Sequence, residues 1–100
     1  MTLHALKLVT IVCEALARPA VLDALAASGA HGWTLATVEG LGPGGARGGE
    51  IPELANLRLE VLLQPAAAAG LLERLERDLF PRYTMIAWET DARVLRPSRF

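Results

Sequence analysis

Hydrophobic and polar residues alternate most regularly between Leu54 and Gln64. Every second position from Ala55 to Leu63 is apolar, and polar or charged side chains occupy most of the positions between them. Successive side chains of a β-strand point to opposite faces of its sheet. The period of two therefore predicts a strand with one buried face.

Three other segments are predicted to be strands because they are short, apolar and rich in β-branched or aromatic residues. They are Leu6–Cys13, Trp33–Glu39 and Tyr83–Thr90. Ala92–Leu95 is a candidate for a short fifth strand at an edge of the sheet.

Two segments show helical periodicity. The first is Ala20–Ser28, where Pro19 suits the first turn of a helix and Gly29 suits the residue after its end. The second follows Pro65 and ends at Pro81, and its apolar positions recur at helical spacing: Leu71, Leu72, Leu75 and Leu79. Its outer side carries two opposite-charge pairs four residues apart, Glu73–Arg77 and Arg74–Asp78.

The resulting order, β-α-β-β-α-β, predicts an α+β protein with the ferredoxin-like sandwich, in which two helices cover one face of an antiparallel sheet. The other face of the sheet is expected to be apolar as well. The residues expected there are Val9, Ile11, Val38, Leu62, Ile86 and Trp88. A sheet that is apolar on both faces needs a second chain to cover it, so we expect an oligomer.

Six of the nine glycines lie between Gly40 and Gly49, and Arg47 is the only charged residue in that stretch. Glycine loses the most backbone freedom on folding, so the segment is expected to be mobile until something holds it. It lacks the G-K-[ST] ending of a P-loop, and a strand rather than a helix follows it. Two interpretations stay open, a loop that orders around a ligand and a plain surface connection.

The composition limits the class of protein. One hundred residues, 52% of them hydrophobic, predict a single domain over residues 1–100 with apolar surface to bury against another subunit. A net charge of −1 argues against a nucleic-acid-binding protein. The single cysteine, Cys13, excludes an internal disulfide, and no secretory leader or membrane-spanning run is recognisable, so we expect a soluble cytoplasmic protein.

Residues that commonly carry chemistry are scattered along the chain. His4, Cys13 and His31 are the candidate metal ligands, but no metal-binding spacing joins them. Glu60 and Glu89, expected on neighbouring strands, are a candidate acid–base pair, although strand carboxylates beside arginines usually form salt bridges. We therefore expect neither catalysis nor a metal site. Six arginines are candidates for one anion-attracting edge in an oligomer: Arg47, Arg58, Arg82, Arg93, Arg96 and Arg99.

Six short motifs are distributed over nearly the whole chain. They are Lys7-Leu8-Val9, Gly29-Ala-His-Gly-Trp-Thr-Leu35, Gly40-Leu41-Gly42, Ala55-Asn56-Leu57-Arg58-Leu59-Glu60, Tyr83-Thr84 and Ala92-Arg93-Val94-Leu95. With these motifs the chain resembles the PII-like signalling proteins, and most closely the branch linked to bicarbonate transporters and carboxysomes.

The resemblance implies a homotrimer whose sheets line the centre, with an adenine nucleotide in each cleft between neighbouring subunits. It implies that Gly32, Trp33 and Thr34 of one subunit contact the base and ribose. Gly40, Gly42 and Arg47 of another subunit would cradle the phosphates. The remaining residues of the implied site are Arg58, Arg82, Tyr83, Thr84, Met85 and Arg96, of which Arg82 to Met85 match the loop that closes over the nucleotide.

In this family, the connection between the second and third strands is the T-loop, here residues 41–53, which changes order with the ligand and docks on a partner. Pro43 and Gly44 stand where relatives often carry a basic residue, which favours AMP, ADP or cyclic AMP over ATP. The resemblance implies a non-enzymatic sensor without a cofactor. Bicarbonate is a candidate second ligand, and a bicarbonate transporter or carboxysome-related protein is a candidate partner. Two alternatives stay open, a ferredoxin-like trimer that binds a divalent metal and a small enzyme whose site forms between subunits.

Overall fold

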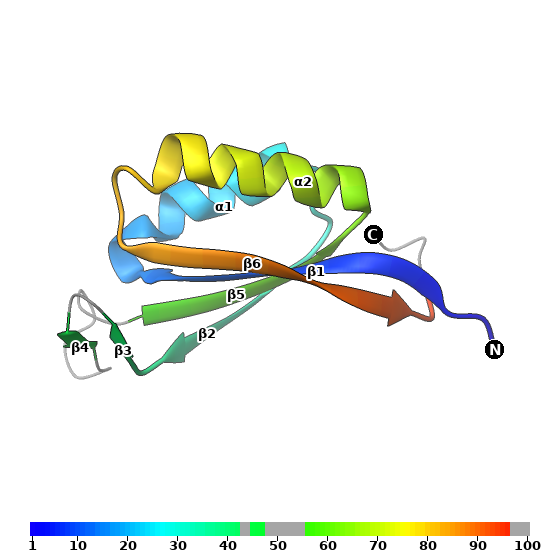
Figure 1. The fold of residues 1–100 in the computed structure, drawn as a ribbon, viewed down its shortest axis with the longest axis horizontal. Coiled ribbons are helices and arrows are strands. Elements are labelled where there is room, and N and C mark those ends of the chain that lie inside the picture. The colour runs from blue at the N-terminus through cyan, green and yellow to red at the C-terminus, as the bar shows by residue number, and fades with distance from the viewer. Residues whose placement is uncertain (43–44, 48–55, 97–100) are drawn as a thin grey trace.

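The computed structural model describes residues 1–42, 45–47 and 56–96, and these form a four-stranded antiparallel sheet with two α-helices on one face (Figure 1). The elements of this layer pair, in chain order, are β1 (His4–Glu14), α1 (Arg18–Ala27), β2 (Thr34–Val38), β5 (Asn56–Leu63), α2 (Pro65–Arg74) and β6 (Met85–Val94). A 3₁₀ turn, Ala15–Ala17, precedes α1, and a π-helical turn, Leu75–Leu79, extends α2. A small separate sheet pairs β3 (Gly40–Gly42) with β4 (Gly45–Arg47).

The strands of the main sheet lie in the order β2-β5-β1-β6. β1 pairs with β5 on one side and with β6 on the other, and β2 pairs with the outer edge of β5, all antiparallel. This strand order, reached through a β-α-β-β-α-β chain path, is that of the ferredoxin-like fold. The predicted α+β class and fold are therefore confirmed.

Local sequence explains where α1 begins and ends. Pro19 lies in its first turn, where a missing N–H group leaves no hydrogen bond unmade. At the other end, the Ser28 hydroxyl donates a 2.7 Å hydrogen bond to the carbonyl of Leu25, and Gly29 has a φ of 82°. Glycine reaches this left-handed conformation without steric cost, so its predicted place after the end of the helix is confirmed.

β6 runs without interruption from Met85 to Val94, so the candidate fifth strand at residues 92–95 is wrong as a separate element. The polar residue Asp91 does not end the strand because its carboxylate accepts a 2.5 Å hydrogen bond from Lys7 Nζ, directly opposite on β1. The ladder between β1 and β6 therefore continues as far as the pair of His4 and Val94.

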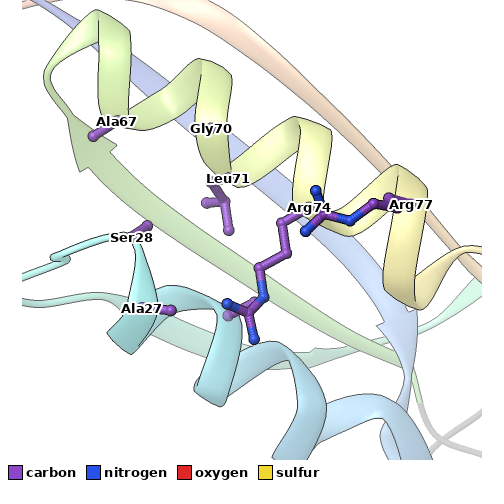
Figure 2. Close-up of a pocket in the computed structure, with 8 residues that line it drawn as sticks. Ala27, Ser28, Ala67, Gly70, Leu71, Arg74 and Arg77 are labelled. Atoms are coloured by element: carbon purple, nitrogen blue, oxygen red, sulfur yellow. The ribbon is translucent and has the colours of Figure 1, made fainter.

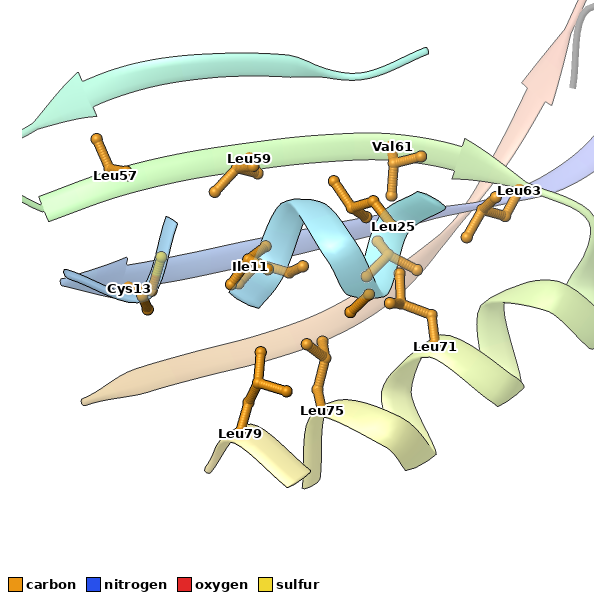
Figure 3. Packing of buried hydrophobic residues seen from close by; sticks show 14 of the residues in the cluster. Ile11, Cys13, Leu25, Leu57, Leu59, Val61, Leu63, Leu71, Leu75 and Leu79 are labelled. Carbon is orange, nitrogen blue, oxygen red and sulfur yellow. The ribbon is translucent and has the colours of Figure 1, made fainter. Parts of the chain in front are cut away.

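The hydrophobic core fills the space between the main sheet and the helical layer (Figure 3). Alternate residues of β5 contribute to it, as their spacing predicted: Leu57, Leu59, Val61 and Leu63. The helical side of the core consists of Val21, Leu25, Leu71, Leu75 and Leu79. Full burial of one such side chain contributes about 1.5–3 kcal/mol, so this layer is the main source of stability.

The prediction for Val9 and Ile11 is wrong, because both point into this core rather than to the face away from the helices. Both are completely buried, and they lie opposite Val61 and Leu59 of β5. β1 is apolar on both faces, so its own pattern does not reveal which residues face the helices. The register of β1 with β5 determines which of its residues face the helices.

We use the term open face for the face of the main sheet opposite the helices. Because side chains alternate between the two faces of each strand, the other four residues predicted for this face do lie there: Val38, Leu62, Ile86 and Trp88. Ile86 is 59% exposed and Trp88 is 39% exposed. Two large apolar side chains of β6 thus face solvent on this chain.

Candidate functional site

A cavity of about 260 Å³ opens on the open face beside the edge strand β2. Its lining residues are Leu8, Gly32, Trp33, Thr34, Glu60 and Leu62, and we call it the Trp33 cavity. Strand register explains their meeting, since Leu8 lies opposite Leu62 and Thr34 lies opposite Glu60. The turn after α1 brings Gly32 and Trp33 to the same place. All three residues predicted to contact a base and ribose therefore line one cavity.

The Trp33 cavity combines an aromatic surface with a carboxylate. Trp33 is 43% exposed, so part of its ring is available for stacking. Glu60 Oε1 accepts a 3.1 Å hydrogen bond from Arg58 Nε on the same face. The pair is solvent-accessible and contributes about 0–1 kcal/mol to stability, so either member can exchange its partner for a ligand at little cost.

A second group of predicted residues lies at the end of the sheet where β6 begins. Glu14, the last residue of β1, donates its backbone N–H to the carbonyl of Thr84 at 3.1 Å. Its carboxylate Oε2 in turn accepts the backbone N–H of Thr84 at 2.7 Å. Met85 lies opposite Cys13. This reciprocal pair ties the segment before β6 to the end of β1.

Arg82 and Tyr83 precede this contact. The Arg82 guanidinium lies 5.2 Å from the centroid of the Tyr83 ring and donates a 3.3 Å hydrogen bond to the Tyr83 hydroxyl. The Tyr83 side chain is half-buried against the core. Arg82 itself is exposed, so its charge is held near the surface by a stacked aromatic ring.

The glycine segment begins at the same end of the sheet (Figure 1). Gly40 pairs with Arg47 across the β3–β4 hairpin, and Gly42 pairs with Gly45. A Cβ on Gly40 would lie 3.5 Å from the side-chain nitrogen of Asn56, which is an ordinary contact distance. Pro43, Gly44 and residues 48–53 of the predicted T-loop lie outside the described residues.

Asn56 connects these two features. It pairs with Glu14 of β1 and with Val38 of β2, so the base of the hairpin lies beside the Glu14–Thr84 contact. We call this the hairpin end of the sheet.

The predicted site residues therefore form separate groups on one chain. Gly32, Trp33 and Thr34 line the Trp33 cavity, with Arg58 bound to its carboxylate. Gly40 and the segment 82–85 lie at the hairpin end. Arg96 follows β6 at the opposite end of the sheet, where His4 pairs with Val94, and Arg99 lies outside the described residues. Among the described residues, Arg58 and Arg82 therefore lie far from Arg96 on a single chain.

The candidate acid–base pair is wrong. Glu60 lies on β5 opposite Thr10, and Glu89 lies on β6 opposite Val9, so β1 separates them and they occupy opposite faces of the sheet. Glu89 instead lies 3.8 Å from the ammonium group of Lys7.

Cys13 is buried, and loss of hydration raises the pKa of its thiol to about 11. It is thus a neutral core residue at physiological pH. Among residues 1–42, 45–47 and 56–96, no group of three or more His, Cys, Asp or Glu side chains is placed to hold a metal ion. Within the same part of the chain, no helix is long and apolar enough to span a membrane.

Residues that the sequence did not assign to the nucleotide site also take part. Leu8, Glu60 and Leu62 complete the Trp33 cavity, and Glu14 anchors the segment before β6. The alternation of β5 places Glu60 on the same face as Leu62, which was a usable signal. No local pattern marks Glu14, because its partner is 70 residues away in the chain.

The fold and the Trp33 cavity beside its edge strand define a ferredoxin-like α+β protein with a surface site on its sheet. The family model of the nitrogen regulatory protein P-II matches residues 6–99. The chain belongs to this P-II family.

Solved structures of PII-like proteins share the fold. A PII-like signaling protein of Thermus thermophilus is 34% identical with a TM-score of 0.88, over 100% of this chain and 99% of that one. CPII of Thiomonas intermedia K12, a nitrogen regulatory PII-like protein solved with ADP, AMP and bicarbonate, is 23% identical with a TM-score of 0.90, over 99% and 96% of the two chains. A second structure of CPII, with ADP and bicarbonate, is 24% identical with a TM-score of 0.89 and covers 99% and 97%. No curated protein matches the chain.

Proposed function

We propose that this protein is a non-enzymatic signalling protein that binds an adenine nucleotide. The observation that carries the proposal is the Trp33 cavity, in which Gly32, Trp33 and Thr34 meet beside a carboxylate. An indole face suits stacking of a purine, and a carboxylate suits its exocyclic amino group. CPII, which shares the fold, holds ADP and AMP in its structure.

We propose that the working form is a homotrimer. Ile86 and Trp88 leave apolar surface on the open face, which a monomer would expose to water at a cost. A trimer also accounts for the separation of the predicted site residues on one chain. The Trp33 cavity of one subunit would hold the base and ribose. Gly40, Gly42 and Arg47 of a neighbour would bind the phosphates, and segment 82–85 would close over the nucleotide.

The regulatory role is part of the same proposal. The chain would act in the cytoplasm as one domain, residues 1–100, whose T-loop at residues 41–53 responds to the nucleotide. Bicarbonate would bind as a second ligand, in keeping with its presence in the CPII structures. The T-loop would then regulate inorganic-carbon uptake or carboxysome function through a transporter or carboxysome-related protein. Such a switch requires that the ligand bind the two loop states with different affinity.

Calorimetry tests the nucleotide site. AMP, ADP, ATP and cyclic AMP are titrated into the protein with and without bicarbonate. Trp33→Ala is expected to weaken the best ligand about 5- to 150-fold, since stacking on an aromatic ring is worth about 1–3 kcal/mol. Arg47→Ala should weaken nucleotides with more phosphates most strongly. Arg18→Ala, at the exposed first position of α1, is the charge-matched control and should bind normally.

Two results would reject the proposal. Equal affinity of wild type and Trp33→Ala would reject the Trp33 cavity as the base site. Absence of binding for all four nucleotides would reject the function. Sedimentation of wild type and Ile86→Glu tests the assembly separately, since a charge on the open face should dissociate a trimer that buries it.

A further inference from the structure

A second cavity, of about 230 Å³, lies in the helical layer between α1 and α2 (Figure 2). Its lining residues are Ala24, Ala27, Ser28, Ala67, Gly70, Leu71, Arg74 and Arg77. It shares no residue with the Trp33 cavity and lies on the other side of the sheet. The proposed nucleotide site does not use it.

Arg74 gives this cavity its chemistry. Figure 2 shows its side chain extending from α2 toward α1, across the cavity. The Arg74 Nε atom is buried, and within the described part of the chain no group accepts its hydrogen. The predicted pair of Arg74 with Asp78 does not supply an acceptor, because Asp78 accepts two hydrogen bonds from Arg77, of 3.0 and 3.1 Å. A buried donor without an acceptor is costly, and folded proteins normally satisfy it with protein, water or ligand.

The walls around this donor are apolar and small. Alanines of both helices, Gly70 and Leu71 form most of the lining. A Cβ on Gly70 would have no atom within 4 Å, although glycine is unfavourable inside a helix. Ser28, the hydroxyl-bearing residue of the lining, already donates to the carbonyl of Leu25. The cavity thus presents a buried cationic donor against an apolar surface.

This combination selects one class of ligand. The Nε–H edge of a guanidinium matches the two oxygens of a carboxylate. A phosphate would need further donors, but Arg77, which also lines the cavity, is bound to Asp78, and the Ser28 hydroxyl is bound to the carbonyl of Leu25. The volume is below the range of about 300–1,000 Å³ that is usual for ligand pockets, so the ligand must be small.

We propose that the cavity between α1 and α2 binds a small carboxylate with a short apolar chain. Its carboxylate accepts the hydrogen bond of Arg74 Nε, and its chain packs against Ala24, Ala27 and Leu71. The cavity shares no residue with the proposed nucleotide site, so carboxylate binding can be confirmed or rejected whether or not a nucleotide binds.

Nuclear magnetic resonance tests the proposal directly through the Nε–H signal of Arg74. Sodium butyrate is added to ¹⁵N-labelled wild-type protein, with sodium chloride and sodium phosphate at the same ionic strength as controls. Butyrate should shift the Arg74 Nε–H signal and the backbone amides of Ala27 and Gly70 in a saturable way. The Nε–H signal of Arg77, already bound to Asp78, should move much less. An equal response to chloride, a stronger one to phosphate, or no saturable response to butyrate would overturn the proposal.

Two variants localise the binding. Arg74→Gln should weaken butyrate roughly tenfold or more, as expected for a lost hydrogen bond to a charged group. Arg18→Gln makes the same change of charge at an exposed position outside both cavities and should leave the affinity unchanged. Gly70→Ala keeps Arg74 but places a methyl group in open space beside the cavity, and it should also weaken butyrate. Normal binding by either Arg74→Gln or Gly70→Ala would contradict the assignment.

Discussion

Replacing Glu14 by alanine removes the acceptor that holds the segment before β6. The Glu14 carboxylate accepts the backbone N–H of Thr84 at 2.7 Å, a short and charge-assisted hydrogen bond. Such bonds contribute about 1.5–3 kcal/mol, and the exposure of Thr84 favours the lower end of that range. The reciprocal backbone bond, from Glu14 N–H to the Thr84 carbonyl, does not involve the side chain and should survive. We therefore expect local loosening rather than unfolding.

Hydrogen exchange of the Thr84 amide measures this loosening. A loss of about 1.5 kcal/mol corresponds to roughly tenfold faster exchange through local opening. Glu14→Gln keeps an oxygen acceptor without the charge, so its Thr84 amide should exchange at a rate between those of wild type and Glu14→Ala. If the nucleotide proposal is right, adenylate affinity should fall in the same order. Unchanged Thr84 exchange in folded Glu14→Ala would refute the reasoning, because it would show that the carboxylate does not hold the segment.

Four other substitutions test the fold. Gly70→Ala should stabilise the protein by about 0.5–1 kcal/mol in urea unfolding, because its Cβ enters open space within a helix, whereas Gly29→Ala should destabilise it at a φ of 82°. Leu59→Ala, at a completely buried position, should cost about 2–5 kcal/mol, and a smaller loss would mean that the site collapses. The hydrogen bond from Lys7, and secondarily its charge, lowers the pKa of Asp91. The interaction therefore stabilises the folded state above the unfolded pKa of about 3.9, and this stabilisation is lost as pH falls through the lower folded pKa. Asp91→Asn should therefore flatten the acid side of the stability profile, and an unchanged profile would assign that side to other carboxylates.

The strands differ in how well their own residues predict their orientation. In β5, polar residues such as Arg58 and Glu60 alternate with buried leucines, so the buried face is evident from the pattern. In β1, Val9 and Ile11 alternate with Leu8 and Val12, and both sets are apolar. Hydrophobic burial then favours neither orientation locally. Pairing with β5 selects one of them, because a shift by one residue would exchange the two faces.

In the candidate site, too, some residues could be predicted from the sequence and others only from the structure. Gly32, Trp33 and Thr34 are adjacent in the chain, so a motif was enough to group them. Leu8 and Leu62 join them only because β1 and β5 pair at that register. Opposite-charge spacing on the second helix predicted Asp78 as a partner for Arg74; the two charges do interact, but Asp78 accepts its hydrogen bonds from Arg77. Spacing permits several such pairs, and side-chain packing selects among them.

Periodicity, helix-end residues and shared motifs by themselves determined the order of the two helices and the four strands of the main sheet, the fold class and the family of this protein, but not the β3–β4 hairpin. These signals are local, since each depends on residues a few positions apart. Only the tertiary structure decided which face of β1 is buried, that the Trp33 cavity forms, and that the Arg74 Nε–H lies between α1 and α2 with no acceptor among the described residues. Those features depend on contacts between residues distant in the chain, and their free energies are set by packing and register rather than by local preference.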